Sequence, residues 1–283
     1  MNGYLQKMRV EHHDPVDYYL TLDDDIHLNE YLGYPLTLTW TGDIQCISCG
    51  KNTKKSFSQG HCYQCFTKLA SCDLCVVSPE RCHYDQGTCR DPEWGESFCM
   101  QPHIVYIANS SGIKVGITKE ANLPTRWIDQ GAVQALPVIA VQTRQQSGFV
   151  EVAFKDHISD KTQWQRMLKA DNRQVDMLSI RDGLLADVAG EIEKLRGQFG
   201  IQAVQPIETE TRVFHYPVQQ YPTYVTSMSF DKTPLIEGTL FGIKGQYLIF
   251  DTGVINLRKF TGYEISFAAG DEKATTASQM SLF

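Results

Sequence analysis

The sequence predicts an α+β protein in which a cysteine-rich zinc-ribbon segment precedes a small antiparallel sheet with helices, flanked by N- and C-terminal β modules. Three observations predict this class. All nine cysteines of the 283-residue chain fall between positions 46 and 99. Two β-rich runs, at 104–108 and 113–118, flank a turn-forming tetrapeptide. Apolar residues recur at helical spacing in 149–154 and 184–199.

Residues 1–45 are expected to form an N-terminal β segment. Short β-prone runs at 18–22 and 36–40 alternate with acidic turns such as Asp23-Asp24-Asp25. This acidic triplet lacks the Gly and the distal Glu of a calcium loop, so we interpret it as a solvated loop.

Residues 46–101 are expected to form a zinc-binding region. Cys46 and Cys49, followed by Gly50, form one C-x-x-C knuckle, and Cys62 and Cys65 form a second. Two thiolates at this spacing bind one tetrahedral ion from a tight turn, for which Gly50 supplies a positive φ. Two knuckles complete four ligands, which predicts a closed structural zinc site. Disulfides do not suit a cytoplasmic chain, and a thioredoxin-like redox site uses a single C-x-x-C.

A second metal site is expected in the same region, from ligands that the sequence does not select. The candidates are Cys72, Cys75, Cys82, His83, Cys89 and Cys99. Cys72 and Cys75 form a further knuckle and are the best-supported pair. Zinc is the expected metal, and an iron–sulfur cluster is the alternative, because sets of four cysteines hold both. Metal binding would supply folding free energy to a segment that buries little apolar surface.

Residues 102–200 are expected to form a core with trailing helices. Runs 104–108 and 113–118 enclose Asn109-Ser110-Ser111-Gly112, which predicts a hairpin. A helix is expected to begin near Pro124, and a second helix carries the apolar residues around 149–154. A further apolar helical stripe at 184–199 ends at Gly200. Strand and helices would thus bring a tyrosine, an arginine and a glutamate to one small site: Tyr106, Arg126 and Glu151.

This order of residues resembles the GIY-YIG nuclease superfamily. Ile104-Val105-Tyr106 matches the first signature and Lys114-Val115-Gly116 the second. Arg126, followed by Trp127, matches the catalytic arginine, Gln130 falls where some members carry histidine, and Glu151 matches the metal-binding glutamate. The chain departs from the pattern because the first Gly is absent and Lys114 replaces the second Tyr. The whole chain is similar to an uncharacterised bacterial family in which cysteine-rich segments precede such a core.

The resemblance implies a metal-dependent DNA endonuclease. Glu151 would hold Mg²⁺ or Mn²⁺, Arg126 would bind the non-bridging phosphate oxygens, and Tyr106 would orient or deprotonate the attacking water. An unperturbed phenol is a poor base at neutral pH, so Lys114 or the metal must assist, and Lys114 is expected to lower the pKa of Tyr106. The lysine equally allows an alternative in which hydrolysis is lost and the chain is a non-catalytic, zinc-stabilised DNA- or RNA-binding adaptor.

Residues 201–267 are expected to form a C-terminal β module. Its β-rich runs are separated by glycine-containing turns, and they lie at 240–243, 247–250, 254–257 and 263–267. Neither these strands nor those of residues 1–45 suffice to bury a sheet face alone, so we expect the two sets to pack together.

Residues 268–283 are expected to form a flexible tail that ends in a partner-binding motif. The terminal sequence resembles the bacterial sliding-clamp-binding motif, Q-L-S/D-L-F in its usual form, and it consists of Gln279, Met280, Ser281, Leu282 and Phe283. The apolar side chains would fill a pocket on the clamp, and the glutamine would make hydrogen bonds at its rim.

Charge and hydropathy limit the classes of partner. The net charge of −7 argues against a broad surface that coats nucleic acid, so DNA binding would be local. Such a local contact, or else a solvated loop, is expected at Lys51, Lys54, Lys55 and Phe57. No run approaches the ~18 apolar residues of a membrane span, and the N-terminus lacks the apolar core of a signal peptide. We therefore expect a cytoplasmic protein without membrane association.

Overall fold

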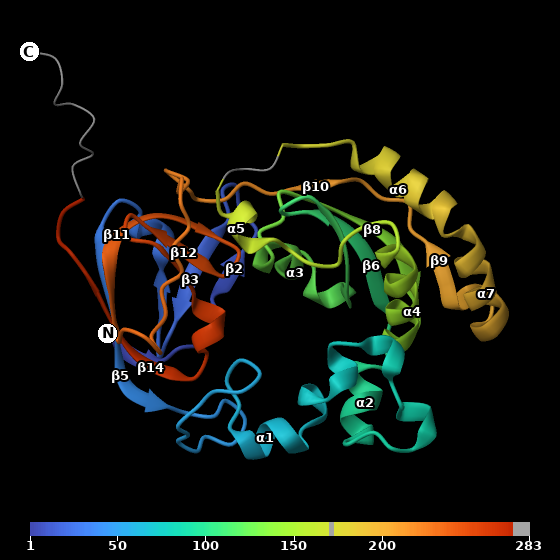
Figure 1. The fold of residues 1–283 in the computed structure, drawn as a ribbon, viewed down its shortest axis with the longest axis horizontal. Helices are drawn as coiled ribbons and strands as arrows, with labels where there is room; N and C mark the ends of the chain where they lie inside the picture. Colours follow the sequence, from blue (N-terminus) through green and yellow to red (C-terminus); the bar gives the residue numbers. More distant parts are fainter. Residues whose placement is uncertain (170–172, 274–283) are drawn as a thin grey trace, which may run out of the picture. The chain divides into compact units, whose positions relative to one another are not determined.

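A computed structural model describes residues 1–169 and 173–273, and the chain divides into two compact units. Unit 1 combines Met1–Cys62 with the chain from Tyr216 onward, and unit 2 spans Tyr63–His215. Figure 1 shows the elements of both units in chain colours.

Unit 1 is built on a six-stranded antiparallel sheet in the order β1-β14-β5-β11-β12-β13. The N-terminal β5 lies between the C-terminal β14 and β11, so the expected packing of the two ends of the chain is confirmed (Figure 1). A separate small sheet, β2-β3-β4, belongs to the same unit. The strands of unit 1 are β1 (Asn2–Tyr4), β2 (Arg9–Glu11), β3 (Asp17–Thr21), β4 (Asp25–His27), β5 (Pro35–Ile44), β11 (Leu235–Lys244), β12 (Tyr247–Phe250), β13 (Val254–Asn256) and β14 (Tyr263–Ala269).

Alternation of side chains explains the main sheet of unit 1. Leu36 and Leu38 of β5 are buried while their neighbours are partly or fully exposed, and Ile265 and Phe267 of β14 follow the same period of two. Strands of this pattern have one apolar face, which is stable only when neighbouring strands extend that face.

Unit 2 contains an antiparallel sheet in the order β10-β8-β6-β7, with β9 also paired to β8. The expected hairpin joins β6 to β7, and Gly112 in its turn has a φ of 132°, which favours glycine. The short strands β9 and β10, which follow residue 200, pair with β8 and so complete this sheet. The strands are β6 (His103–Asn109), β7 (Ile113–Lys119), β8 (Gln134–Val141), β9 (Val204–Pro206) and β10 (Arg212–Val213).

The helices of unit 2 begin at recognisable caps. Asp91 caps α2 through the Trp94 amide at 3.0 Å, and Thr143 with Gln146 forms a capping box at the start of α4. The helices are α1 (Tyr63–Lys68), α2 (Pro92–Phe98), α3 (Thr125–Asp129), α4 (Arg144–Lys155), α5 (Trp164–Met167), α6 (Met177–Asp187) and α7 (Ala189–Phe199).

The expectation of one helix over 184–199 is wrong, because the stripe is divided between two helices. Asp176 accepts a hydrogen bond from the Ser179 amide and starts α6 well before the stripe. The chain leaves helical geometry at Val188, and α7 then begins with Gly190 in its first turn, a weak helix former. As expected, Gly200 ends α7, with a φ of 97°.

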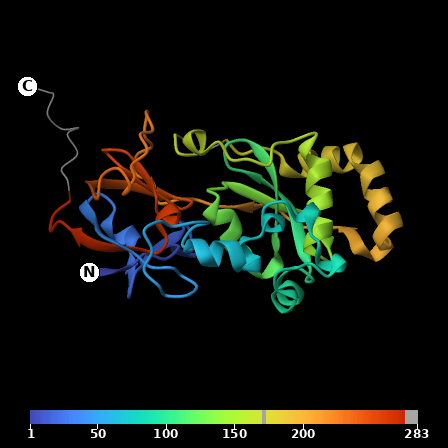
Figure 2. The same cartoon turned by 60° about the horizontal axis from the view of Figure 1, so that its bottom comes forward.

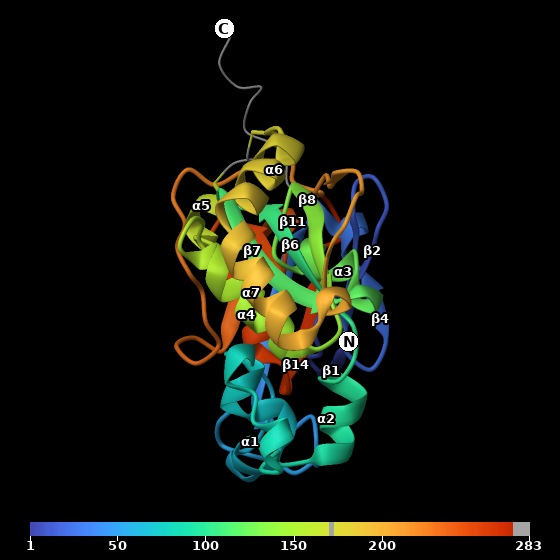
Figure 3. The same ribbon diagram turned by 90° about the vertical axis from the view of Figure 1, so that its right-hand side faces the viewer.

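One face of the unit 2 sheet carries the apolar core. Val105 and Ile107 of β6 and Val115 of β7 pack with Val150 and Phe154 of α4, and residues of α6 and α7 complete the cluster. These three helices lie together on one side of the strands (Figures 2 and 3). No helix in the described ranges is long and apolar enough to cross a membrane.

Candidate functional site

A cluster of polar side chains lies on the sheet face that the apolar core leaves free. In the β6–β7 pairing Tyr106 is opposite Gly116, and Ala108 is opposite Lys114. Because side chains alternate along a strand, Tyr106, Lys114 and Gly116 point to the face opposite Val105, Ile107 and Val115. The hairpin therefore places Tyr106 beside Gly116 on the face that the apolar core leaves free.

Tyr106 is fully buried, and its phenol has several neighbours. Gln130, directly after α3, donates a hydrogen bond from its side-chain nitrogen to the phenol oxygen at 2.6 Å. The Trp127 ring meets the phenol edge-to-face at 5.9 Å between centroids. Burial raises the pKa of Tyr106, although the Arg126 charge and the hydrogen bonds from Gln130 and Arg126 lower it. The net shift is upward because desolvation dominates, and the expected lowering contribution of Lys114 stays a prediction.

Gly116 provides the space that the phenol occupies. A Cβ added to Gly116 would lie 2.6 Å from the Tyr106 phenol oxygen and 2.7 Å from the ring carbon that carries it. Real Cβ atoms do not approach other atoms this closely, so the pair depends on glycine at 116.

Lys114 is a buried cation, with 7% of its surface exposed. Burial, and secondly the charge of Arg126, lowers the pKa of Lys114 to about 8, while Glu151 and Asp160 act in the opposite direction. Lys114 therefore has a substantial neutral fraction at mildly alkaline pH.

Glu151 is carried by α4, whose capping box fixes the first turn. Its side chain is only 12% exposed, and burial raises the pKa of Glu151 against the opposing effect of Lys155. Lys155, one helical turn on, pairs with Glu151 at 3.5 Å and with Asp160 at 3.1 Å. Neither Lys155 nor Asp160 was expected in the site. The spacing of four residues between Glu151 and Lys155 is the sequence signal that points to the first pair.

The structure brings together the five residues that the sequence proposes for catalysis. They come from β6, β7, α3 with the residue that follows it, and α4: Tyr106, Lys114, Arg126, Gln130 and Glu151. Gln130 is hydrogen-bonded to Tyr106, and the charges of Arg126 and Glu151 act on both Tyr106 and Lys114. Arg126 is exposed, Gln130 is half-buried, and the other three lie deeper. The site therefore presents a cation at the surface above a buried phenol and a buried lysine.

The first cysteine set forms a compact group compatible with a zinc ribbon. The sulfurs of Cys46, Cys49, Cys62 and Cys65 all lie within 4.8 Å of one another. Gly50 has the expected positive φ, of 68°. Burial alone would raise the pKa of Cys46, but backbone N–H groups, including that of Cys62, lower it to about 6. Four sulfurs in this arrangement can hold a metal ion such as zinc.

The remaining cysteines lie in unit 2 and are arranged differently. Cys75, Cys82, Cys89 and Cys99 line one cavity together with His83, whereas Cys72 does not line it. The terminal motif, Gln279–Phe283, lies outside the residues that the structure describes.

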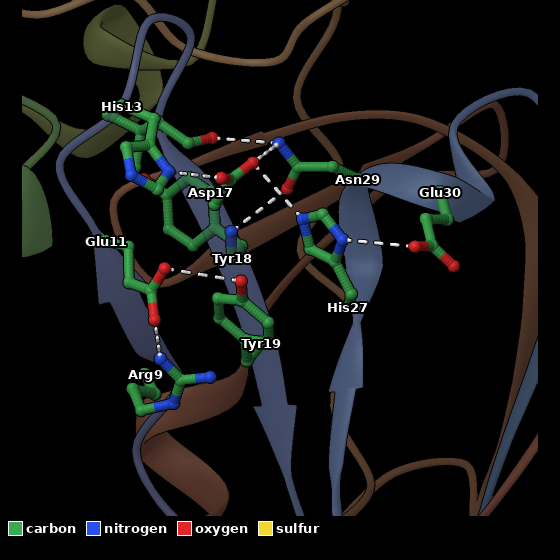
Figure 4. Close-up of polar contacts among 10 residues, drawn as sticks. Arg9, Glu11, His13, Asp17, Tyr18, Tyr19, His27, Asn29 and Glu30 are labelled. Carbon is green, nitrogen blue, oxygen red and sulfur yellow. Dashed lines mark hydrogen bonds and ion pairs between the residues drawn. The ribbon is translucent and has the colours of Figure 1, made fainter.

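A third group of possible ligands, Glu11, His13 and Asp17, lies on the β2–β3 hairpin. Asp17 already accepts hydrogen bonds from its neighbours: His13 at 2.6 Å, His27 at 3.1 Å and Asn29 at 3.0 Å (Figure 4). Burial would raise the pKa of Asp17, but the hydrogen bonds and charges of His13 and His27 lower it. The contacts account for the group as a surface network of unit 1.

These features define an α+β protein with a cluster of four cysteines that can hold a metal ion and a separate polar cluster on an antiparallel sheet. A family profile matches residues 33–265, and the chain belongs to that family, which is described as "Protein of unknown function (DUF2797)". Comparisons with curated proteins and with solved structures gave no match.

Proposed function

We propose that this protein is a metal-dependent DNA endonuclease that hydrolyses phosphodiester bonds and is recruited to the replication sliding clamp, in replication or repair. The observation that carries the proposal is the convergence of Tyr106, Lys114, Arg126 and Glu151 from four separate elements. Each residue type suits phosphoryl chemistry, because a guanidinium binds phosphate oxygens and a carboxylate binds a hard cation.

The burial and charge of each residue suggest its role in hydrolysis. Arg126, exposed at the surface, binds the non-bridging oxygens of the phosphate. Tyr106 keeps its proton, because burial raises its pKa, and its hydroxyl orients the attacking water. Burial lowers the pKa of Lys114 to about 8, so its neutral form is able to accept a proton from that water at mildly alkaline pH.

Glu151 supplies the type of ligand that magnesium and manganese prefer, a carboxylate. It is a single carboxylate, and Mg²⁺ is commonly bound by one or two carboxylates together with substrate phosphate and water. Lys155 would have to release Glu151 for this, which the alternative partner Asp160 allows. A bound ion would stabilise negative charge on the phosphate and the leaving oxygen.

Nicking of supercoiled and branched DNA tests the proposal. Mg²⁺-dependent cleavage is expected for the wild type and is expected to be lost in Tyr106→Phe and Glu151→Ala. The exposed Glu93→Ala, in the cysteine-rich segment, serves as the matched control. Equal cleavage by wild type and both site variants would place the activity elsewhere or in a contaminant.

The recruitment part of the proposal rests on the C-terminal motif and is tested separately. Purified clamp should capture the full chain but not a chain lacking residues 279–283. Capture of both forms to the same extent would remove the clamp from the proposal and leave the nuclease part untouched.

A non-catalytic, zinc-stabilised DNA- or RNA-binding adaptor is the second candidate. The complete burial of Tyr106 and the pairing of Glu151 with Lys155 favour it, because both catalytic groups are engaged with protein partners. This candidate predicts that Arg126→Ala weakens nucleic-acid binding, while Tyr106→Phe and Glu151→Ala spare it and no substrate is cleaved.

A further inference from the structure

The cysteine-rich part of unit 2 surrounds a cavity with four thiols. Cys75, Cys82, Cys89 and Cys99 all line it, and Cys99 is buried at the end of α2. The sulfurs of Cys75, Cys82 and Cys99 make no hydrogen bond within the described residues. Cys89 makes one, to the Asp91 carbonyl at 3.3 Å. Three buried or half-buried thiols without polar partners, facing one cavity, indicate a ligand set.

The spacing of these sulfurs differs from that of the first cysteine set. A single zinc ion with Zn–S bonds of about 2.3 Å holds its sulfurs about 3.8 Å apart, and the Cys46 set is compact enough for this. Among the described residues, Cys82, Cys89 and Cys99 form no such group within 4.8 Å. Thiols spread around a cavity suit a cluster of several metal ions, in which different irons take the thiolates.

The spacing of these cysteines in the sequence also differs from that of a structural zinc site. Six, six and nine residues separate Cys75, Cys82, Cys89 and Cys99, so none of the four forms a C-x₂₋₄-C knuckle with another. Structural zinc sites usually take ligands in such closely spaced pairs. Cys72 and Cys75 are spaced as a knuckle in the sequence, but only Cys75 lines the cavity. Cys72 therefore does not join Cys75 in the ligand set.

Asp73 and His83 lie near Cys75 and are the competing ligands. The Asp73 carboxylate is paired with Arg90 at 2.5 Å and accepts a hydrogen bond from the Cys75 amide at 3.4 Å. The His83 ring nitrogen Nδ1 contacts the Thr88 hydroxyl at 2.8 Å. Both side chains therefore already hold the loops together, which leaves the thiols of Cys75, Cys82 and Cys99, together with the weakly engaged thiol of Cys89, as the available ligands.

We propose that Cys75, Cys82, Cys89 and Cys99 bind an iron–sulfur cluster, and that Cys72 is not a ligand. The cluster is a second metal centre, distinct from the zinc site of Cys46, and it does not depend on the nuclease proposal.

The cluster loops are attached to the helix that carries Glu151. The Arg144 guanidinium donates to the Val76 carbonyl at 2.6 Å, and the Arg144 amide donates to the Cys99 carbonyl at 2.8 Å. The Gln145 side chain donates to the Cys82 carbonyl at 2.9 Å. Loss of the cluster is therefore expected to loosen the first turn of α4.

Metal analysis of the full chain, produced with added iron and purified without oxygen, tests the proposal. The wild type should contain iron and acid-labile sulfide in equal amounts, a broad visible absorption, and about one zinc per chain. Cys82→Ser and Cys89→Ser should lose iron, sulfide and colour but keep the zinc. Cys72→Ser, the matched control, should keep all of them.

Two outcomes would overturn the proposal. One is a wild-type protein with about two zinc ions per chain and no sulfide, which would assign a second zinc site. The other is loss of the cluster in Cys72→Ser, which would place Cys72 among the ligands. Retained zinc in the serine variants shows that they are folded, and the wild-type composition decides the question even where a variant is insoluble.

Discussion

Gln130 donates a 2.6 Å hydrogen bond to the phenol oxygen of Tyr106, which joins the residue that ends α3 to the central strand β6. The phenol is fully buried, and the Gln130 amide oxygen is buried without a hydrogen-bond partner among the described residues. An unpaired buried oxygen costs free energy, and the hydrogen bond that the other end of the same side chain donates to Tyr106 opposes that cost. That end positions the phenol.

A double-mutant cycle measures this contact. Tyr106→Phe and Gln130→Leu should each lower the free energy of unfolding in urea, and the double variant should lose less than the sum. The expected coupling is about 0.5–1.5 kcal/mol, the usual range for one internal hydrogen bond. Strict additivity of the two losses would mean that the contact contributes nothing to stability.

Gly116→Ala is expected to displace the phenol of Tyr106. The new Cβ would lie 2.6 Å from the phenol oxygen, and the ring is enclosed by Trp127 and the sheet. Overpacking of this kind costs about 1–3 kcal/mol, measurable by urea denaturation, and DNA cleavage should fall with it if the phenol is catalytic.

Gly183→Ala in α6 is the matched control for Gly116→Ala. An added Cβ at Gly183 meets no atom within 4 Å, and alanine favours the helix, so stability should rise by about 0.5–1 kcal/mol. Equal effects of the two substitutions would contradict the packing argument.

Lys114 makes the stability of the protein depend on pH in the alkaline range. Its pKa in the folded chain is about 8, below the 10.5 of an exposed lysine, so the unfolded state binds more protons between these values. The contribution of this residue to the free energy of unfolding therefore increases as the pH rises from 8 to 10.5, and it is least favourable below pH 8.

Lys114→Met should accordingly stabilise the protein most at pH 7, and its advantage over wild type should shrink at pH 9.5. Urea denaturation at the two pH values measures the difference. Lys169→Met, at an exposed position, is the control and should show no such trend. An advantage of Lys114→Met that is independent of pH would mean that the lysine is not titrating in this window.

Removal of metal from the first cysteine set should destabilise the protein. Cys49→Ser removes one of four sulfurs that lie within 4.8 Å of one another, and a structural metal contributes its binding free energy to folding. Zinc content should fall by about one ion per chain, and the melting temperature should fall with it. Ser48→Ala, in the same turn, should keep the zinc. An unchanged zinc content in Cys49→Ser would exclude this set as the site.

Local patterns predicted much of the fold. The β6–β7 hairpin and the first pair of knuckles were visible because each depends on a few neighbouring residues, such as Gly112 and Gly50 with their positive φ. The break at Val188 was not predicted, because the apolar pattern continues across it without interruption. The early start of α6 was also missed, because it depends on the N-cap at Asp176, which lies before the apolar pattern begins.

The candidate site was predictable in its residues but not in its electrostatics. The order of Tyr106, Arg126 and Glu151 along the chain pointed to one site, yet the sign of the Tyr106 pKa shift depends on how deeply the phenol is buried. The choice between Cys72 and its neighbours likewise depends on which loops face the cavity, which is a property of tertiary packing.

Gly148→Ala should separate the cysteine-rich segment from α4. A Cβ at Gly148 would lie 2.8 Å from the Pro79 carbonyl carbon and would also meet the Glu80 amide, and backbone atoms cannot move aside as a flexible side chain can. We expect a loss of about 1–3 kcal/mol and faster amide hydrogen exchange in Cys82 and its neighbours. Gly197→Ala in α7, where the added atom meets nothing within 4 Å, is the control. Exchange at Cys82 that stays as slow as in wild type would show that the segment does not depend on this contact with α4.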